Sequence, residues 1–454
     1  MLERLFKLKE NNTDVKTEFI AGLTTFMAMA YIIVVNPAII AASGMDYYAA
    51  FTATIIATVV GTLIMGLYAN VPYVQAPGMG LNVLFSYTIC IGLGFTWEQA
   101  LAMVFICGIF NIIFTATRLR RLLLDNIPLF LQHAIGVGIG LLVTYIGIKN
   151  ANLITFSISK ITDGVAQASD VTPLISTFNS PEIILAIIGL VVTSIFLVKK
   201  VKGGILFGII ITTLIGIPLG VTNIGAIEPL HISLATSFLK LDFAGLFTYK
   251  AGIVVVVMTI LTLSLSDIFD TIGTFIGTGQ KSGIFGEHLS ESTGEKNKKL
   301  EKALYADSVA TSIGAIIGTS NTTTFVESAA GIEVGGRTGL TSVFVAILFL
   351  IALFFAPLIG AIPTVATAPA LILVGLFMVE SIVKIKWKDL VIAIPAFFTI
   401  VFMPFSYSIT SGIEMGFIFY IIVKGVKGEY KDVHPILYAF VALFIIDFLY
   451  KALF

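Results

Sequence analysis

The chain has 454 residues, of which 57% are hydrophobic and 12% charged, and its mean hydropathy is +1.00. Because soluble domains carry about 25% charged residues, this composition excludes an ordinary soluble domain and predicts an integral membrane protein built of helices. The formal net charge is zero, so we expect no nucleic-acid partner. The two cysteines, Cys90 and Cys107, lie in apolar stretches and are interpreted as packing residues, with no disulfide framework.

The N-terminal segment MLERLFKLKENNTDVKTEF is polar and mixed in charge, and the apolar run after it is long enough to span a bilayer. We therefore expect no cleaved signal peptide. A helix needs about 20 residues to cross the hydrocarbon core, and the apolar runs predict fourteen spans. A further apolar run, 434–452, has no counterpart in the first half and either spans the membrane or lies along its surface. The predicted spans are 19–41, 49–69, 73–93, 98–117, 132–149, 182–198, 203–219, 251–277, 303–318, 322–336, 338–357, 365–382, 388–403 and 406–424.

Lysine and arginine test this arrangement independently of hydropathy. With fourteen spans, all the main basic clusters fall on one side of the membrane, and the opposite loops, 150–181 and 220–250, hold few basic residues. The positive-inside rule therefore supports fourteen spans and predicts a cytoplasmic N-terminus. The clusters are the N-terminus to Lys16, Arg118–Arg121, Lys199–Lys202, 281–302, Lys384–Lys388 and Lys424–Lys431.

The third and tenth predicted spans are unusual in the same way. They read VPYVQAPGMGLNVLFSY and GTSNTTTFVESAAGIEVGG, and each passes from an extended-favouring stretch through small residues into a short apolar helix. Interrupted segments at matching places in two halves are the best sequence indication of a transporter binding site. Seven spans in each half also require the halves to be inverted. We predict a first repeat over 1–219, an external connector over 220–250, a second repeat over 251–424 and a C-terminal apolar segment over 425–454.

Four carboxylates fall inside the predicted spans: Asp267 and Asp270 in the eighth, Asp307 in the ninth and Glu327 in the tenth. Each costs roughly 2.5–3.5 kcal/mol to place at the middle of a helix in a bilayer, and the nearest basic residue, Arg337, lies at the end of the tenth segment. The spacing of three predicts neighbouring positions on one helix face for the two eighth-span aspartates. The structural alternative is that such a carboxylate only caps a broken helix.

Other polar and small residues receive plainer interpretations. The spacings Gly136–Gly140, Gly273–Gly277 and Gly314–Gly318 are typical of close helix contacts. The four histidines form no metal-binding pattern, and we expect no metal and no cofactor. No phosphate-binding loop and no nucleophile–base arrangement is present in the sequence, so neither an ATP-driven pump nor an enzyme is favoured.

The carboxylates indicate what kind of ligand such a site would hold. An ionised carboxylate only accepts hydrogen bonds, so two of them facing one pocket suit a neutral, flat ligand rich in N–H donors. Backbone N–H groups at the broken helices suit its carbonyl oxygens. Desolvation raises the pKa of carboxyl groups in general, which allows one to carry a proton. The residues alone therefore predict a proton-coupled secondary transporter for a polar organic solute.

Four motifs then resemble a known family. FIAGLTTFMAMAYIIVVNP, APGMGLNVLFSY, DIFDTIGTFIG and GTSNTTTFVESAAGI are together similar to the AzgA-type purine permeases of the nucleobase:cation symporter group, and the similarity covers essentially the whole chain. The resemblance implies an all-α uracil-permease-like fold of fourteen spans, with spans three and ten half strand and half helix. It also implies a core domain of spans 1–4 and 8–11 and a gate domain of spans 5–7 and 12–14.

The resemblance also implies roles for particular residues. Glu327 and Asp270 match acids that hold the base, and Asn82 with Gly80 matches a third-span motif for purine recognition. Asp267 and Asp307 match positions required for transport, while Thr274 stands where uracil permeases have a histidine. Phe325 and Phe85 are candidates for stacking on the base, and Ser328 is a candidate for supporting the site or the proton route.

We expect import of hypoxanthine, guanine or adenine by proton symport. The alternatives left open are another nucleobase, uracil or xanthine, and a sulfate-type anion transporter of the same fold. The choice of purine, proton against sodium coupling, the carboxylate that carries the proton and the oligomeric state, a homodimer included, also stay open.

Overall fold

The computed structural model describes residues 2–117, 126–158, 171–223, 234–248, 252–282, 284–285, 295–355, 358 and 361–453. This part of the chain is mostly helical, and it includes eight helices that are long and apolar enough to cross a membrane. The predicted basic cluster Arg118–Arg121 and most of 281–294 lie outside the described residues, as does much of the predicted connector 220–250. The eight helical segments are Val15–Ala41, Tyr47–Ala69, Trp97–Ala116, Leu129–Asn150, Pro181–Val198, Gly252–Thr271, Thr364–Lys384 and Ile409–Val426.

Every predicted span in the first half coincides with a helix or a strand–helix pair. The first span is divided near Ala30 into two helices, and the second ends in a π-helical turn. The elements are α1 (Leu2–Phe6), α2 (Val15–Met29), α3 (Ile32–Ala41), α4 (Tyr47–Ile64) with η1 (Met65–Ala69), β1 (Gln75–Pro77), α5 (Met79–Val83) with η2 (Leu84–Gly92), α6 (Trp97–Ala116), α8 (Leu129–Asn150), α9 (Pro181–Val198) and α10 (Gly204–Gly216).

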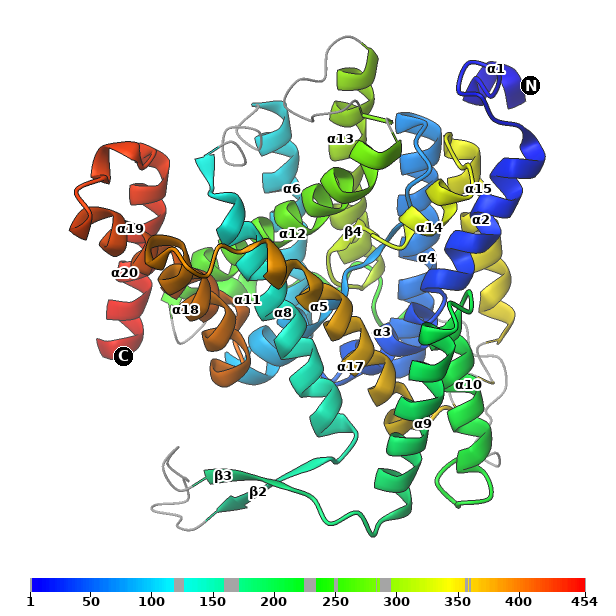
Figure 1. Ribbon diagram of the computed structural model, residues 1–454, viewed down its shortest axis with the longest axis horizontal. Helices are drawn as coiled ribbons and strands as arrows, with labels where there is room; N and C mark the ends of the chain where they lie inside the picture. The colour runs from blue at the N-terminus through cyan, green and yellow to red at the C-terminus, as the bar shows by residue number, and fades with distance from the viewer. Residues whose placement is uncertain are drawn as a thin grey trace.

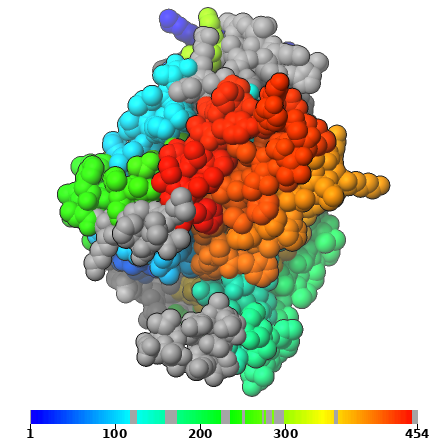
Figure 2. Space-filling view, turned by 90° about the vertical axis from the view of Figure 1, so that its left-hand side faces the viewer, coloured from blue at the N-terminus to red at the C-terminus, as the bar shows by residue number. Residues whose placement is uncertain are grey.

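The second half follows the same pattern with different interruptions. The run 434–452 is helical and packs against α19 and α12. Figure 2 shows the C-terminal segment, in red, on the outer face of the molecule. The elements are α11 (Phe243–Phe247), α12 (Gly252–Ser282), α13 (Glu295–Ile317), β4 (Thr322–Thr324), α14 (Ser328–Glu333), α15 (Gly339–Ala352) with η6 (Leu353–Phe355), α17 (Thr364–Val379) with η7 (Glu380–Lys384), α18 (Leu390–Ser406), α19 (Ile409–Val426), η8 (Tyr430–Asp432) and α20 (Pro435–Leu453).

Helix starts follow from local side chains. Asp14 accepts a hydrogen bond from the Thr17 N–H at the start of α2, and Thr96 and Gln99 form a capping box at the start of α6. Ser180 caps α9, where Pro181 occupies the first turn. These contacts satisfy N–H groups that have no partner within the helix.

The two unusual segments meet as an antiparallel pair. Strand β1 pairs with β4 in the register Gln75↔Thr324, Ala76↔Thr323 and Pro77↔Thr322. Each strand leads into a short helix, α5 after β1 and α14 after β4. All six strand residues are buried, and their pairing satisfies backbone groups that would be costly to leave open inside the membrane. The predicted half-strand, half-helix construction is therefore present in both segments.

The helices pack in two groups. Helices α2, α4, α6, α13 and α15 contact one another around the strand pair, and α8, α9, α10, α17, α18 and α19 form the second group. In Figure 1 the first group lies in the upper right of the view, and the second runs below it from α18 and α19 at the left to α9 and α10 at the lower right. Glycines permit close approach within the first group, because a Cβ on Gly339 of α15 would lie 1.8 Å from the Gly66 carbonyl oxygen of η1.

The predicted loop 150–181 contains a hairpin that the sequence did not lead us to expect. Strands β2 (Ile154–Ile158) and β3 (Val171–Ile175) pair antiparallel. In Figure 1 the hairpin projects at the bottom, at the end of the molecule opposite the N-terminus. The fold is thus mostly helical with one short hairpin outside the helices.

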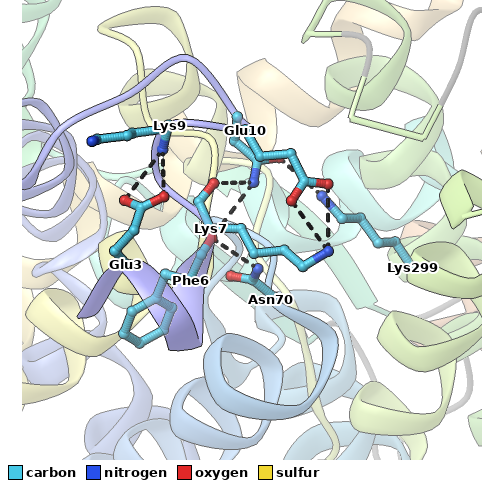
Figure 3. A network of polar contacts seen from close by, with 8 residues as sticks. Glu3, Phe6, Lys7, Lys9, Glu10, Asn70 and Lys299 are labelled. Carbon is cyan, nitrogen blue, oxygen red and sulfur yellow. Dashed lines mark hydrogen bonds and ion pairs between the residues drawn. The ribbon is translucent and has the colours of Figure 1, made fainter. Parts of the chain in front are cut away.

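The N-terminal segment folds onto the top of the first group of helices. Asn70 Nδ2 donates to the Phe6 carbonyl oxygen at 3.1 Å, and Lys299 Nζ donates to Asn11 Oδ1 at 3.1 Å (Figure 3). Phe6 and Leu8 are buried against Leu340 of α15. These contacts tie the segment to η1, α13 and α15.

Candidate functional site

A cavity of about 700 Å³ lies between the two groups of helices. Of the residues predicted for the site, Asp270, Thr274 and Glu327 line it. The first two come from α12, and Glu327 directly precedes α14. The opposite wall comes from the other group, through Ile139 of α8 and Val374 of α17 among others.

The three threonines of β4 alternate between two sides of the strand, as successive residues of a strand must. Thr323 Oγ1 donates to Asp270 Oδ2 at 3.1 Å, whereas Thr324 Oγ1 donates to Asp307 Oδ1 at 3.1 Å. Thr322 lies on the Thr324 side, and a Cβ on Gly314 of α13 would lie 2.4 Å from its hydroxyl oxygen. Strand β4 therefore contacts Asp270 on the cavity side and Asp307 on the opposite side.

Asp270 is held in a confined position at the end of β1. A Cβ on Gly78 would lie 2.8 Å from Thr323 Oγ1 and 3.2 Å from Asp270 Oδ2. Although Asp270 lies in the middle of the long helix α12, the residue is exposed, because it opens onto the cavity. Its carboxylate is thus available to a ligand while one oxygen is fixed by Thr323.

Glu327 is fixed from a different helix. Tyr31, at the break between α2 and α3, donates its phenolic O–H to Glu327 Oε1 at 2.7 Å. Glu327 is the N-cap residue of α14, although its side chain forms no capping hydrogen bond to that helix. Nothing in the run MAYIIVV distinguishes Tyr31 from a packing residue, so its contact with Glu327 could not be predicted from the sequence.

Asp267 and Asp307 are fully buried and do not line the cavity. Asn111 Nδ2 of α6 donates to Asp267 Oδ2 at 2.7 Å, and Thr311 Oγ1 of α13 donates to the same oxygen at 3.3 Å. Thr271 Oγ1 donates to Asp307 Oδ1 at 2.5 Å. Asp267 therefore faces α6 and α13 and not the cavity that Asp270 lines. A spacing of three turns the side chain by about 60°, toward α6 and α13.

The remaining predicted residues surround the strand pair without lining the cavity. Asn82 Nδ2 donates to the Pro77 carbonyl oxygen at 3.2 Å, and Ser320 Oγ donates to Asn82 Oδ1. Ser328 Oγ accepts from the Val74 N–H at 3.1 Å. Three further residues are packing positions: Phe85 and Phe325 lie in the main apolar core, and Gly80 allows the close approach of Ile139, whose Cγ2 would lie 2.6 Å from a Cβ there.

Arg337 does not neutralise Glu327. Its Nη1 donates to the carbonyl oxygens of Ile332 and Gly336 at 2.5 and 2.7 Å, at the C-terminal end of α14, where a cation is favoured. The backbone N–H of Arg337 donates at 2.9 Å to Glu18, a fully buried carboxylate of α2 that also accepts from Thr341. Glu18 does not stand out in the sequence, because it lies next to the polar N-terminal segment.

Basic residues line another part of the cavity. Lys202 and Lys384 belong to two of the predicted cytoplasmic clusters. Lys202 Nζ donates to Thr24 Oγ1 at 3.3 Å. The cavity therefore joins an acidic part, at Asp270 and Glu327, to a part with basic side chains.

Most of the chain matches a known protein family. The model of the permease family matches residues 16–415. This chain belongs to the permease family. The resemblance noted in the sequence is thereby confirmed.

Two relatives match this permease along nearly its whole length. It is 38% identical over 450 residues to the adenine permease AdeP of Escherichia coli K12, covering 99% of this chain and 96% of AdeP. It is 40% identical over 454 residues to the guanine/hypoxanthine permease PbuO of Bacillus subtilis 168, covering 98% and 99%. This permease is accordingly an integral membrane protein.

Solved structures show the same fold in a distant protein. The transmembrane domain of the cyanobacterial bicarbonate transporter BicA superposes with a TM-score of 0.60 at 16% sequence identity, covering 92% of this permease and 96% of that domain. At this identity the likeness concerns the fold alone.

Proposed function

We propose that this permease imports purine nucleobases together with protons and holds the base in the cavity between Asp270 and Glu327. The observation that carries the proposal is the convergence of these two carboxylates, from α12 and from the start of α14, on one cavity. The relatives named as adenine and guanine/hypoxanthine permeases support the substrate class.

The proposed chemistry follows from what the two groups can accept. Ionised carboxylates accept hydrogen bonds from ring N–H groups and from an exocyclic amino group. Thr323 and Tyr31 each occupy one carboxylate oxygen with a donor. Both carboxylates therefore keep a fixed orientation, which reduces the ordering cost when a base binds.

We assign the coupled proton to this carboxylate pair. A neutral substrate binds more easily between two carboxylates when one of them is protonated, because two like charges that share a site repel each other. In this assignment Asp267, Asp307, Thr274 and Ser328 support the site and the strand pair. Gly80, Asn82, Phe85 and Phe325 then act on the base only through the position of α5 and β4.

We further propose fourteen spans in two inverted repeats, over 1–219 and 251–424, with the N-terminus cytoplasmic and the protein in the plasma membrane. The two packing groups correspond to the proposed core domain (spans 1–4 and 8–11) and gate domain (spans 5–7 and 12–14). The cavity between them then opens toward the cytoplasm, since Lys202 and Lys384 lie in cytoplasmic clusters. Movement of the core against the gate would expose the site to the other side.

The two carboxylates of the cavity also bear on the alternative substrates. A sulfate-type or other inorganic anion would be repelled by Asp270 and Glu327, and neither carboxylate is paired with a basic side chain among the contacts of the described residues. Uracil and xanthine would fit the same hydrogen-bonding logic. The names of the relatives favour adenine, guanine and hypoxanthine over uracil and xanthine.

The test is uptake into cells that lack their own nucleobase permeases. Radiolabelled hypoxanthine should enter saturably, and a protonophore should abolish its accumulation. Excess adenine or guanine should compete, whereas uracil and sulfate should not. Absence of purine uptake by well-expressed protein would contradict the proposal. Uptake that is insensitive to the protonophore would contradict proton coupling.

A further inference from the structure

Asp270 and Glu327 leave one requirement of a 6-oxopurine unmet. Carboxylates accept hydrogen bonds, but the exocyclic oxygen of hypoxanthine or guanine needs a donor. A buried carbonyl without a donor lowers affinity substantially. The cavity should therefore contain a donor close to the two carboxylates.

Ser266 meets this requirement by position. It lies on α12 one turn before Asp270 and lines the same cavity. A separation of four residues places the two side chains on one face of the helix, about 6 Å apart along its axis. A flat base lying along this face contacts both side chains when the Ser266 hydroxyl, whose oxygen is buried in this structure, turns toward the cavity.

The Ser266 hydroxyl also differs from its neighbours in its hydrogen bonding. Ser266 is 3% exposed, and its Oγ has no hydrogen-bond partner within the described part of the chain. By contrast, Thr259 and Thr262 of the same helix donate to carbonyl oxygens one turn back, at 2.7 and 2.9 Å. Thr274, on the cavity side, donates to the Thr324 carbonyl oxygen at 3.2 Å.

A buried hydroxyl without a partner is costly, and a serine in a helix ordinarily bonds to the preceding turn. We propose that Ser266 donates a hydrogen bond to the exocyclic oxygen of a bound 6-oxopurine, making it a specificity-determining residue of this permease. The assignment rests on the proposed purine function. It adds a side-chain donor one helical turn from Asp270.

The test pairs a change in the protein with a change in the ligand. Inhibition constants against radiolabelled hypoxanthine uptake are measured for unlabelled hypoxanthine and 6-mercaptopurine. The latter keeps the ring N–H groups but replaces the oxygen by sulfur, a weak acceptor. Wild type should prefer hypoxanthine. Ser266→Ala should weaken hypoxanthine roughly tenfold while changing 6-mercaptopurine little, so that the preference disappears.

Two further variants make the result specific. Ser266→Thr retains the hydroxyl and should keep the wild-type preference for hypoxanthine over 6-mercaptopurine. Thr262→Val removes a hydroxyl already bonded within the helix and should leave both constants unchanged. Ser266→Cys, with its weak donor, should also lose the preference, which covers a failure of the alanine variant to fold.

Equal weakening of both ligands by Ser266→Ala, or no change in either, would overturn the assignment while leaving the purine function intact. Absence of purine uptake in wild type would instead overturn the proposed function, and the Ser266 assignment with it. The wild-type measurement therefore separates the two failures.

Discussion

Tyr31 and Glu327 lie 296 residues apart in the chain, yet the phenolic O–H of one donates to the carboxylate of the other at 2.7 Å. Tyr31 comes from the break in the first span, and Glu327 comes from the turn between β4 and α14. The contact joins the first span to the strand–helix segment of the second half. It fixes the direction in which the carboxylate faces the cavity.

Removal of this contact should weaken substrate binding without stopping the transport cycle. Tyr31→Phe keeps the ring and removes the hydrogen bond to the Glu327 carboxylate. A hydrogen bond to a charged group contributes about 1.5–3 kcal/mol, and a water molecule that takes the place of the hydroxyl recovers part of this. We expect the KM for hypoxanthine uptake to rise roughly tenfold with little change in maximal rate. The control is Tyr438→Phe, which removes an exposed hydroxyl of α20 that donates to the Tyr430 carbonyl oxygen of η8. Equal effects of the two variants would contradict the role of Tyr31.

Gly78 should tolerate no side chain, because an added Cβ would press on both Thr323 and Asp270. We expect Gly78→Ala to reduce hypoxanthine uptake by at least roughly tenfold at normal membrane abundance, through displacement of the Asp270 carboxylate. Gly425→Ala in α19, where a Cβ meets nothing within 4 Å, should transport normally. Normal uptake by the Gly78 variant would mean that the Thr323–Asp270 contact is dispensable.

Glu18 should matter for stability and not for substrate. Its carboxylate accepts from the backbone N–H groups of Arg337, Thr338 and Thr341, and Glu18→Gln turns an amide donor toward some of these donors. An unsatisfied buried group costs about 1–3 kcal/mol, so the melting temperature in detergent should fall by several degrees.

The control for Glu18 is a neighbouring glutamate at the surface. Glu10→Gln removes an ion pair with Lys7 whose side chains are 52% and 57% exposed, and such pairs contribute about 0–1 kcal/mol. Its melting temperature should match wild type. A Glu18 variant as stable as wild type would show that the cluster of N–H donors finds other partners.

The N-terminal segment should likewise contribute through packing. Phe6 is 2% exposed and packs against Leu340, whereas Leu5, one residue earlier, is 52% exposed. Phe6→Ala should destabilise the protein by about 3 kcal/mol, and Leu5→Ala should have little effect. Thermal unfolding monitored by size-exclusion chromatography compares the two variants, and similar melting temperatures for both would mean that this segment does not hold the helices together.

Much of this architecture could be predicted because membrane insertion imposes strong patterns. Long apolar runs predicted the apolar helices, and the matched segments around Pro77 and Thr322 predicted the strand–helix pairs. Asp270 and Glu327 stood out because charges are rare in such runs. The cost of a buried charge is visible in a sequence without any knowledge of its neighbours.

The rest depends on contacts between distant residues, which composition does not reveal. Tyr31 and Ser266 look like ordinary members of apolar helices, and only the folded chain shows that Tyr31 contacts Glu327 and that Ser266 lies beside the cavity. Asp267 was placed beside Asp270 by its spacing, but its side chain contacts Asn111 of α6. The partner of a buried polar group is a property of the fold, so one sequence could not supply it.

The central claim is that Asp270 and Glu327 together hold the base, and equilibrium binding to the purified permease tests it most directly. Radiolabelled hypoxanthine should bind saturably to wild type and to Glu333→Gln, whose altered residue lies exposed at the end of α14 outside the cavity. Asp270→Asn and Glu327→Gln should each weaken binding at least roughly tenfold, since each replaces an acceptor by a group with a competing donor. Equal affinity in all four proteins would place the purine site elsewhere.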